Sequence, residues 1–246
     1  MWIIGHAAPD IRDSINSVRK CKMSKAAIIT GLDISSSKVS AVALEFPGAG
    51  HSTILACESL PSKGVYRGSF TDIAEASGSI AKVLTRLGEK IGRRPDNIYA
   101  NISGESIRGE KSKGMIPLSS RGREVTNLDI ERCINAASTI RLTFDREVIH
   151  KIVLNFSIDD QPGIKNALGL YASRLYCEMY IITANLNHIQ NIYKCVNNAG
   201  YDVKELFYSG IADGASVLED EWKEEGVMLL NTGLRLAPEK IRLRVA

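Results

Sequence analysis

The sequence predicts an α/β protein that carries an α+β insertion. Three expected strands within residues 26–59 precede a helix that begins near residue 72 and a short strand at 97–102. After a stretch of different character, the pattern of this first part resumes with a helix expected at 185–199. The stretch between them has its own strand–helix–strand–strand pattern. An interrupted pattern of this kind indicates a small second unit inserted into a larger domain.

The composition is that of an ordinary globular protein. The 246 residues are 44% hydrophobic and 24% charged, and the net charge of +3 is too small to argue for nucleic acid or an anionic membrane surface. No apolar stretch approaches the roughly 20 residues that a membrane-spanning helix needs. Five cysteines lack CxxC spacing and nearby histidine pairs, which favours reduced cytoplasmic thiols over a disulfide scaffold or a zinc site: Cys21, Cys57, Cys133, Cys177 and Cys195.

The stretch 31–39 suggests a ligand class. An apolar strand ends in the hydroxyl-rich turn Ser35-Ser36-Ser37-Lys38, from which a second strand leaves. Backbone N–H groups and hydroxyls in such a turn can bind a phosphate chain, and Asp33 at the strand end can hold a hydrated Mg²⁺. The competing interpretation is an ordinary hairpin turn, and the glycine patterns of a P-loop or a Rossmann turn are absent.

The expected helices of the first part have clear boundaries. Asp72 or Thr71 caps a helix to about residue 87, and Asn185 caps one that Gly200 ends. Further along we expect a strand at 203–208, a short helix at 211–218 and a charged link at 222–225. The last expected strand, 226–230, ends in Asn231-Thr232-Gly233.

The inserted stretch contains a basic segment, 108–123, that could suggest nucleic acid. It has no interleaved aromatic residues and is punctuated by glycine and serine, so we expect a solvated loop. Thr126 and Asp129 form the pattern of a capping box and begin a helix. Strands are expected at 148–158 and 174–183, and His150 beside the first of them is expected to be a packed, structural histidine.

Many short motifs resemble FtsA, the bacterial actin-like cell-division family, over residues 26–233. The segment 33–38 is similar to the family's DIGSSK phosphate motif, with Ser35 where glycine is usual. Lys63-Gly64-Val65-Tyr66-Arg67-Gly68 with Asp72 is similar to its SRGIRRG segment. The other matches follow in the family's order: 102–104, 123–129, 146–150, 163–164, 169–175, 181–183 and 191–200.

The resemblance implies an actin-like ATPase domain I with an inserted FtsA-type subdomain IC. Subdomain IA would comprise 26–104 and 185–224, and IC would comprise 105–184. ATP and Mg²⁺ would bind in the cleft between domains I and II, with Asp33 holding Mg²⁺ through water. Phosphate would contact Ser35, Ser36, Ser37, Lys38, Asn231, Thr232 and Gly233. No catalytic residue is assigned, and the intact family member would be at most a weak ATPase.

The resemblance also implies the partners. Members of the family link FtsZ filaments to the cytoplasmic membrane, recruit other divisome proteins and self-associate into actin-like filaments. A cytoplasmic location, at the membrane of the division site for the intact protein, is therefore expected. No nucleic-acid partner is expected.

The sequence departs from the family pattern near its C-terminal end. Asn231 stands where an acidic residue is usual, and 234–236 replace a glycine-rich turn. Residues 1–25 are expected to be a disordered extension, and 225–246 the start of domain II followed by an aberrant tail. We therefore expect domain II to be largely missing, the C-terminal membrane helix to be absent, and this chain to be inactive with negligible ATP binding.

Two alternatives stay open at this stage. A type IV pilus assembly protein related to FtsA shares the first phosphate motif, but the matches at 63–72 and 163–175 favour FtsA. An actin-fold small-molecule kinase would need a general base and a substrate pocket, for which no residue pair stands out.

Overall fold

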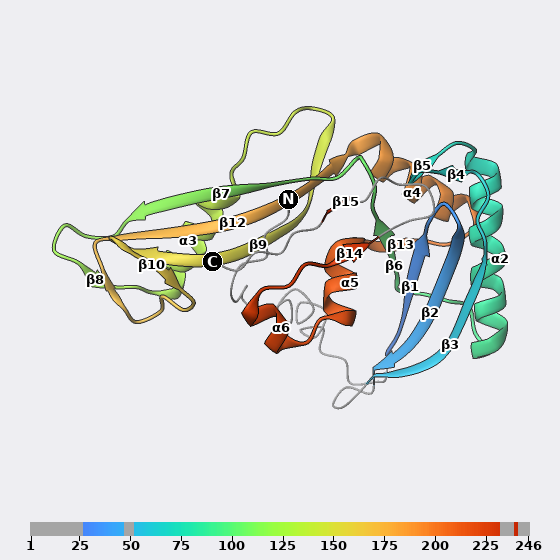
Figure 1. Cartoon of the computed structure of the whole chain (residues 1–246), viewed down its shortest axis with the longest axis horizontal. Coiled ribbons are helices and arrows are strands. Elements are labelled where there is room, and N and C mark those ends of the chain that lie inside the picture. The colour runs from blue at the N-terminus through green and yellow to red at the C-terminus, as the bar shows by residue number, and fades with distance from the viewer. Residues whose placement is uncertain (1–26, 47–51, 232–238, 241–246) are drawn as a thin grey trace.

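The molecule is elongated, with a β-sheet in each half (Figure 1). The structure is a computed structural model and describes residues 27–46, 52–231 and 239–240. The expected extension at 1–25 lies outside the described residues. Among the described residues, no helix is long and apolar enough to cross a membrane.

The first sheet has five strands in the order β13-β6-β1-β2-β3. Three of them form the antiparallel meander that was predicted: β1 (Ala27–Ile34), β2 (Lys38–Phe46) and β3 (Thr53–Pro61). β6 (Ile98–Ile102) and β13 (Val203–Tyr208) run parallel to β1. The carboxyl ends of the three parallel strands therefore meet at one edge, beside the β1–β2 turn.

Two long helices cover one face of this sheet. α2 (Ile73–Ile91) begins because the Asp72 side chain accepts a hydrogen bond from the Glu75 N–H (2.9 Å), and it ends at Gly92, whose φ of 70° suits glycine. α4 (Leu186–Asn198) packs beside it. One core forms between helices and sheet, including Leu32, Val39, Ile80, Leu84, Ile98 and Ile192.

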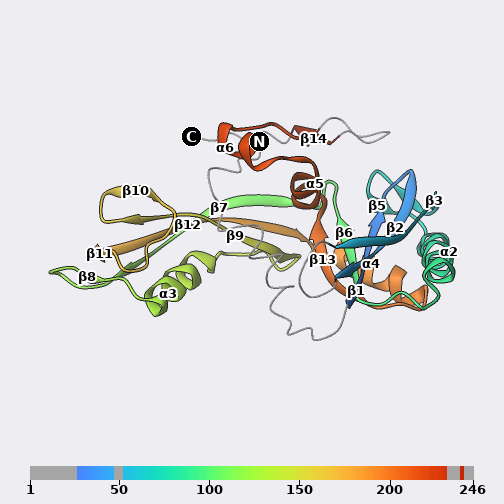
Figure 2. The same ribbon diagram turned by 90° about the horizontal axis from the view of Figure 1, so that it is seen from below.

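The inserted unit is a four-stranded sheet in the order β10-β9-β12-β7, with α3 (Asn127–Ser138) on one face. Figure 2 shows α3 on one side of this sheet and, on the other, α5 (Ser209–Val217) and α6 (Asp220–Glu225). Alternate residues of β12 point toward α3 and are almost fully buried, including Leu175, Cys177, Met179 and Ile181. Its strands are β7 (Arg108–Pro117), β9 (Arg146–Ile158), β10 (Gln161–Ile164) and β12 (Arg174–Asn185).

The expectation of a solvated loop at 108–123 is wrong for its first ten residues. They form β7, which pairs antiparallel with β12 along its whole length. Gly114 allows the close approach to α3, because a Cβ there would lie 2.2 Å from the Ala137 nitrogen. The charged residues Lys111 and Lys113 fall on the opposite, open face. Tertiary pairing therefore overrides the polar composition.

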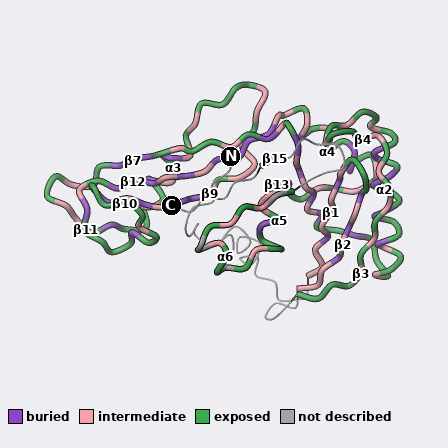
Figure 3. The backbone as a smooth tube through the Cα atoms, in the orientation of Figure 1, coloured by how far each residue is buried: buried purple, intermediate pink, exposed green. Residues whose placement is uncertain are grey.

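Smaller elements complete the described chain. Residues 222–225, expected as a link, belong to α6 (Asp220–Glu225), and the strand expected at 226–230 shortens to β14 (Leu230–Asn231). The remaining elements are β4 (Val65–Tyr66), β5 (Ser69–Phe70), β8 (Arg123–Glu124), β11 (Tyr171–Ala172), α5 (Ser209–Val217) and β15 (Glu239–Lys240). Figure 3 shows buried stretches along both sheets, with exposed segments concentrated in the turns and outer surfaces.

The inserted unit begins and ends at one place, and Arg146 bonds both crossings. Its Nη2 donates to the Ser106 and Thr183 carbonyl oxygens, each at 2.9 Å, and its Nε donates to the Thr183 hydroxyl at 3.0 Å. The Asn185 N–H also donates to the Ser106 carbonyl (3.2 Å). The chain therefore enters and leaves the insertion through one hydrogen-bonded junction.

The predicted capping box of α3 is confirmed and extended by an ion pair. The Thr126 N–H and hydroxyl donate to Asp129 Oδ2 (3.1 and 2.7 Å), and the Asp129 N–H donates to the Thr126 hydroxyl (3.4 Å). Arg123 binds both carboxylate oxygens at 2.6 and 2.7 Å. These bonds hold the pKa of the buried Asp129 well below its usual range, and the bonds from Arg123 have the largest effect.

Replacing Asp129 with asparagine should lower the free energy of unfolding by about 2 kcal/mol at pH 7, because charge-assisted bonds are lost. A folded-state pKa below the unfolded value means that the stabilisation is present above about pH 4 and lost as the pH falls through the folded pKa. Urea unfolding of wild type and D129N from pH 7 to pH 2 should therefore show a difference that shrinks in acid.

The matched control is Asp160→Asn, the same change at an exposed position of the same unit. We expect it to change the unfolding free energy by less than about 0.5 kcal/mol. A D129N effect as small as that of D160N would contradict the assignment of Asp129 as the residue that fixes the start of α3.

Candidate functional site

The turn between β1 and β2 has the shape that the sequence predicts. The Ser35 N–H and hydroxyl both bond the Lys38 carbonyl, at 3.0 and 2.9 Å, which closes the turn. Ser36, Ser37 and Lys38 are exposed at its tip. Their side chains are therefore open to a ligand, and their phosphate-binding role stays a prediction.

The segment 62–70 supports this turn from one side. The Gly68 N–H donates to the Ser36 hydroxyl (3.0 Å), and the Ser62 N–H donates to the Ser37 carbonyl (3.1 Å). Gly64 has a φ of 71°, and a Cβ there would lie 2.2 Å from the Asp72 carbonyl oxygen. The glycines of this segment thus let it pack between the turn and the start of α2.

Asp33 lies beneath the turn, where β1 ends, and is bound by Asn101. The Asn101 Nδ2 group donates to Asp33 Oδ1 (2.5 Å) and to the Ser209 hydroxyl (3.1 Å), while its Oδ1 accepts from the Ile34 N–H (2.8 Å). Burial raises the pKa of Asp33, Lys38 opposes this, and the negative charge of Asp213 adds to the rise.

Asn231, near the C-terminal end of the described chain, lies close to Asp33 through a shared neighbour, Asp213. Its Nδ2 group donates to Asp213 Oδ2 at 2.6 Å, and Asp213 is the carboxylate that raises the pKa of Asp33. Thr232 and Gly233, the other two candidates there, lie outside the described residues. The structure therefore groups Asp33, the turn and Asn231 at one edge of the sheet.

Sequence reasoning missed Asn101, Ser209 and Asp213. Asn101 and Ser209 stand at the carboxyl ends of β6 and β13, the parallel neighbours of β1. Ligands of open α/β sheets bind outside those ends. Polar residues at the carboxyl ends of the predicted strands could therefore have indicated these site residues.

The donor set suits a hard cation that keeps its water. Carboxylate oxygens are ligands that Mg²⁺ prefers, and one or two protein carboxylates suffice when phosphate supplies the rest. Among the described residues, no group of three or more His, Cys, Asp or Glu side chains could hold a metal ion. Asp33 and Asp213 bring two carboxylates to this edge of the sheet, and carboxylate oxygens are ligands that suit Mg²⁺.

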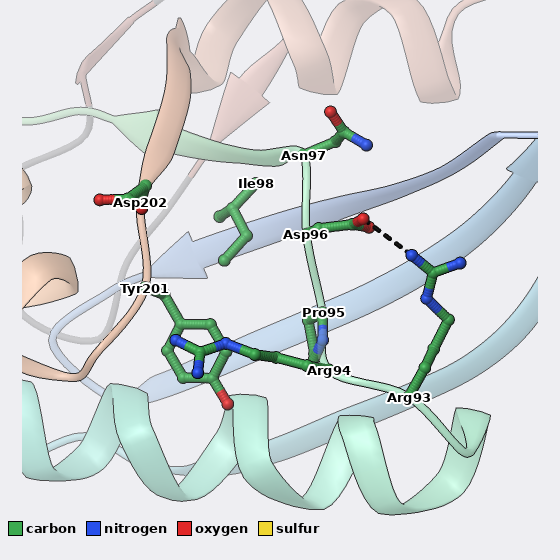
Figure 4. A pocket seen from close by; sticks show the side chains of 8 residues that line it. All are labelled: Arg93, Arg94, Pro95, Asp96, Asn97, Ile98, Tyr201 and Asp202. Atoms are coloured by element: carbon green, nitrogen blue, oxygen red, sulfur yellow. Dashed lines mark hydrogen bonds and ion pairs between the residues drawn. The ribbon is translucent and has the colours of Figure 1, made fainter.

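A cavity of about 660 Å³ lies at the opposite edge of the sheet, where β6 and β13 begin (Figure 4). Both arginines that line it are already engaged: Arg93 pairs with Asp96 at 2.8 Å, and Arg94 donates to the Gly200 carbonyl while it stacks on Tyr201. These groups are engaged in structure, and they lie away from the Asp33 cluster.

Comparison with known proteins identifies the family. Residues 104–183 match the family described as the SHS2 domain inserted in FTSA. Over 206 residues, 84% of this chain, it is 32% identical to cell division protein FtsA of Pseudomonas aeruginosa and 30% identical to that of Escherichia coli. The chain is a homologue of FtsA. It spans about half the length of the curated relatives it matches, 49% in both cases.

The comparisons confirm an actin-like mixed α/β fold with the FtsA-type insertion. Among solved structures, the type IV pilus complex PilM–PilN matches 82% of this chain and 53% of its own, with a TM-score of 0.51 and 15% identity. A likeness at that identity concerns the fold alone. It does not favour the pilus alternative over FtsA.

Replacing Asp33 with asparagine should raise the free energy of unfolding at pH 7. Its folded-state pKa lies above the unfolded value, so the ionised carboxylate is less favourable in the folded chain than in the unfolded one. The neutral amide removes this penalty and can still accept from Asn101. The gain should shrink as the pH falls through the raised pKa, which urea unfolding at several pH values measures.

Asp202→Asn, an exposed change at the opposite edge of the sheet, is the control and should leave stability unchanged at every pH. If D33N is less stable than wild type at pH 7, Asp33 is a net structural anchor, and its carboxylate is not held at a cost for a ligand.

Proposed function

We propose that this FtsA homologue supplies the phosphate-binding wall of an ATP–Mg²⁺ site. The observation that carries the proposal is the cluster at the carboxyl ends of β1, β6 and β13. It combines a closed hydroxyl turn, the exposed Lys38 and the half-buried carboxylate of Asp33. Membership of the FtsA family, whose members bind ATP, supports the same ligand.

Each part of the cluster has a role in this proposal. The hydroxyls of Ser35–Ser37 and Lys38 contact the phosphate oxygens, with Lys38 supplying positive charge. Asp33 holds Mg²⁺ through water, and Asn101 orients its carboxylate. Asn231, Thr232 and Gly233 are also assigned to the phosphates in this proposal, as the family resemblance implies. Mg²⁺ bound with the nucleotide would offset the negative charge of the phosphates, and Asp33 and the turn would position it.

We also propose the subdomain assignment and the cellular role. Residues 26–104 and 185–224 form subdomain IA, and 105–184 form subdomain IC, consistent with the family match at 104–183. Within a complete FtsA-type protein, this part contributes to the link between FtsZ filaments and the cytoplasmic membrane, to recruitment of divisome proteins and to filament formation. Subdomain IC is the partner surface in this proposal.

NMR titration of the chain with ATP–Mg²⁺ tests the nucleotide site at residue resolution. We expect amide shifts at 33–38, 101, 209 and 231, with a dissociation constant on the order of 1 mM, because the described residues contact the phosphates chiefly from one side. Lys38→Gln should weaken binding about tenfold, equivalent to about 1.4 kcal/mol.

The matched control is Lys204→Gln, which removes the same charge near the start of β13. It should bind like wild type. No shifts at 10 mM ATP–Mg²⁺, or shifts gathered around Arg94 and Tyr201 instead, would contradict the proposed site.

A further inference from the structure

His150 is the point where the inserted sheet touches the end of β13. It lies on β9, opposite Ile182 of β12, and its Nε2 accepts a hydrogen bond from the Tyr208 N–H at 2.9 Å. Its ring packs against Phe207 with centroids 5.3 Å apart and planes at 47°. One imidazole of the insertion therefore bonds the backbone of the other sheet where β13 becomes α5.

The imidazole is neutral under physiological conditions and serves as an acceptor. Burial lowers the pKa of His150 to about 4. In the neutral ring that accepts through Nε2, the proton resides on Nδ1. Protonation at neutral pH therefore does not compete with the bond from Tyr208.

The Tyr208–Ser209 turn is itself closely packed. A Cβ on Gly210 would lie 2.6 Å from a ring carbon of Tyr208, so the ring lies directly over the glycine backbone. The Ser209 hydroxyl bonds the Ile102 carbonyl (3.3 Å) and the Asn101 amide (3.1 Å). These hydrogen bonds fix the turn to the end of β6.

From Asn101 the contacts reach Asp33 and Ile34 at the end of β1. A continuous path thus runs from His150 through the Tyr208–Ser209 backbone and the Asn101 amide to the candidate Mg²⁺ carboxylate. Every step is a hydrogen bond or a peptide link, and the path crosses from the inserted unit to the first sheet.

We propose that His150 is a positioning residue for the nucleotide site and couples that site to the inserted unit. It fixes the Tyr208–Ser209 turn, which orients Asn101 and, through it, Asp33. Linkage requires the effect to be reciprocal, so ligand at Asp33 alters β9. This coupling rests on the proposed ATP site, whereas the positioning of Asn101 is a property of the chain alone.

Two substitutions separate positioning from packing. His150→Gln keeps an acceptor near the place of Nε2, whereas His150→Phe keeps a ring against Phe207 and removes the acceptor. The matched control is His188→Phe on α4, where the histidine ring also packs on a phenylalanine, Phe70, at 5.8 Å.

Amide hydrogen exchange of the ligand-free chain gives the first measurement. We expect H150F to speed exchange at Tyr208 and at Ile34, whose N–H binds Asn101, about tenfold relative to Met179 in the inserted core. H150Q and H188F should match wild type. Equal acceleration at all three amides, or none at Ile34, would show that His150 only packs and would overturn the proposal.

Titration of each variant with ATP–Mg²⁺ gives the second measurement. We expect H150F to bind about fivefold more weakly than wild type, H150Q to restore binding, and ATP–Mg²⁺ to shift the His150 imidazole resonances of wild type. Binding unchanged in H150F would overturn the coupling. No binding by wild type, with Ile34 exchange still altered in H150F, would contradict the ATP site and support the positioning role.

Discussion

The side-chain amide of Asn101 is the constraint on which the edge of the first sheet depends. It bonds the backbone of β1, the carboxylate of Asp33 and the hydroxyl that begins α5. An amide can do this because it both donates and accepts and carries no charge. It therefore orients the carboxylate without neutralising it. A residue that lacked either function would leave a part-buried group unpaired, at a cost of about 1–3 kcal/mol.

The local parts of this structure could be predicted because their signals lie within a few residues. The turn 35–38, the Asp72 cap that begins α2 and the capping box of α3 each show in the sequence as a local signal, whereas α2 runs to Ile91, past the end expected near residue 87. The interrupted pattern of strands and helices predicted an insertion, and the family resemblance identified the fold as actin-like and the insertion as FtsA-type. It also supplied the candidate phosphate residues, whose role stays a prediction.

The rest depends on pairing between distant segments, which local patterns do not encode. Asn101 and Ser209 meet because β6 and β13 are parallel neighbours, although they are far apart in the chain. β7 has the composition of a loop and becomes a strand because β12 supplies hydrogen bonds and α3 covers the face that holds Gly114 and Ile116. In each case, a segment distant in sequence determines the conformation or the position of the residues.

The single junction at Arg146 has a consequence for the order of folding. β6 and β13 pair directly, yet the whole inserted unit is synthesised between them. The first sheet cannot be completed until that unit has left the ribosome, and closing so long a loop costs conformational entropy. If the insertion folds first and Arg146 holds its two ends together, the loop that remains to be closed consists mainly of α4 and its connections. The folded insertion would then lower the entropic cost of pairing β13 with β6.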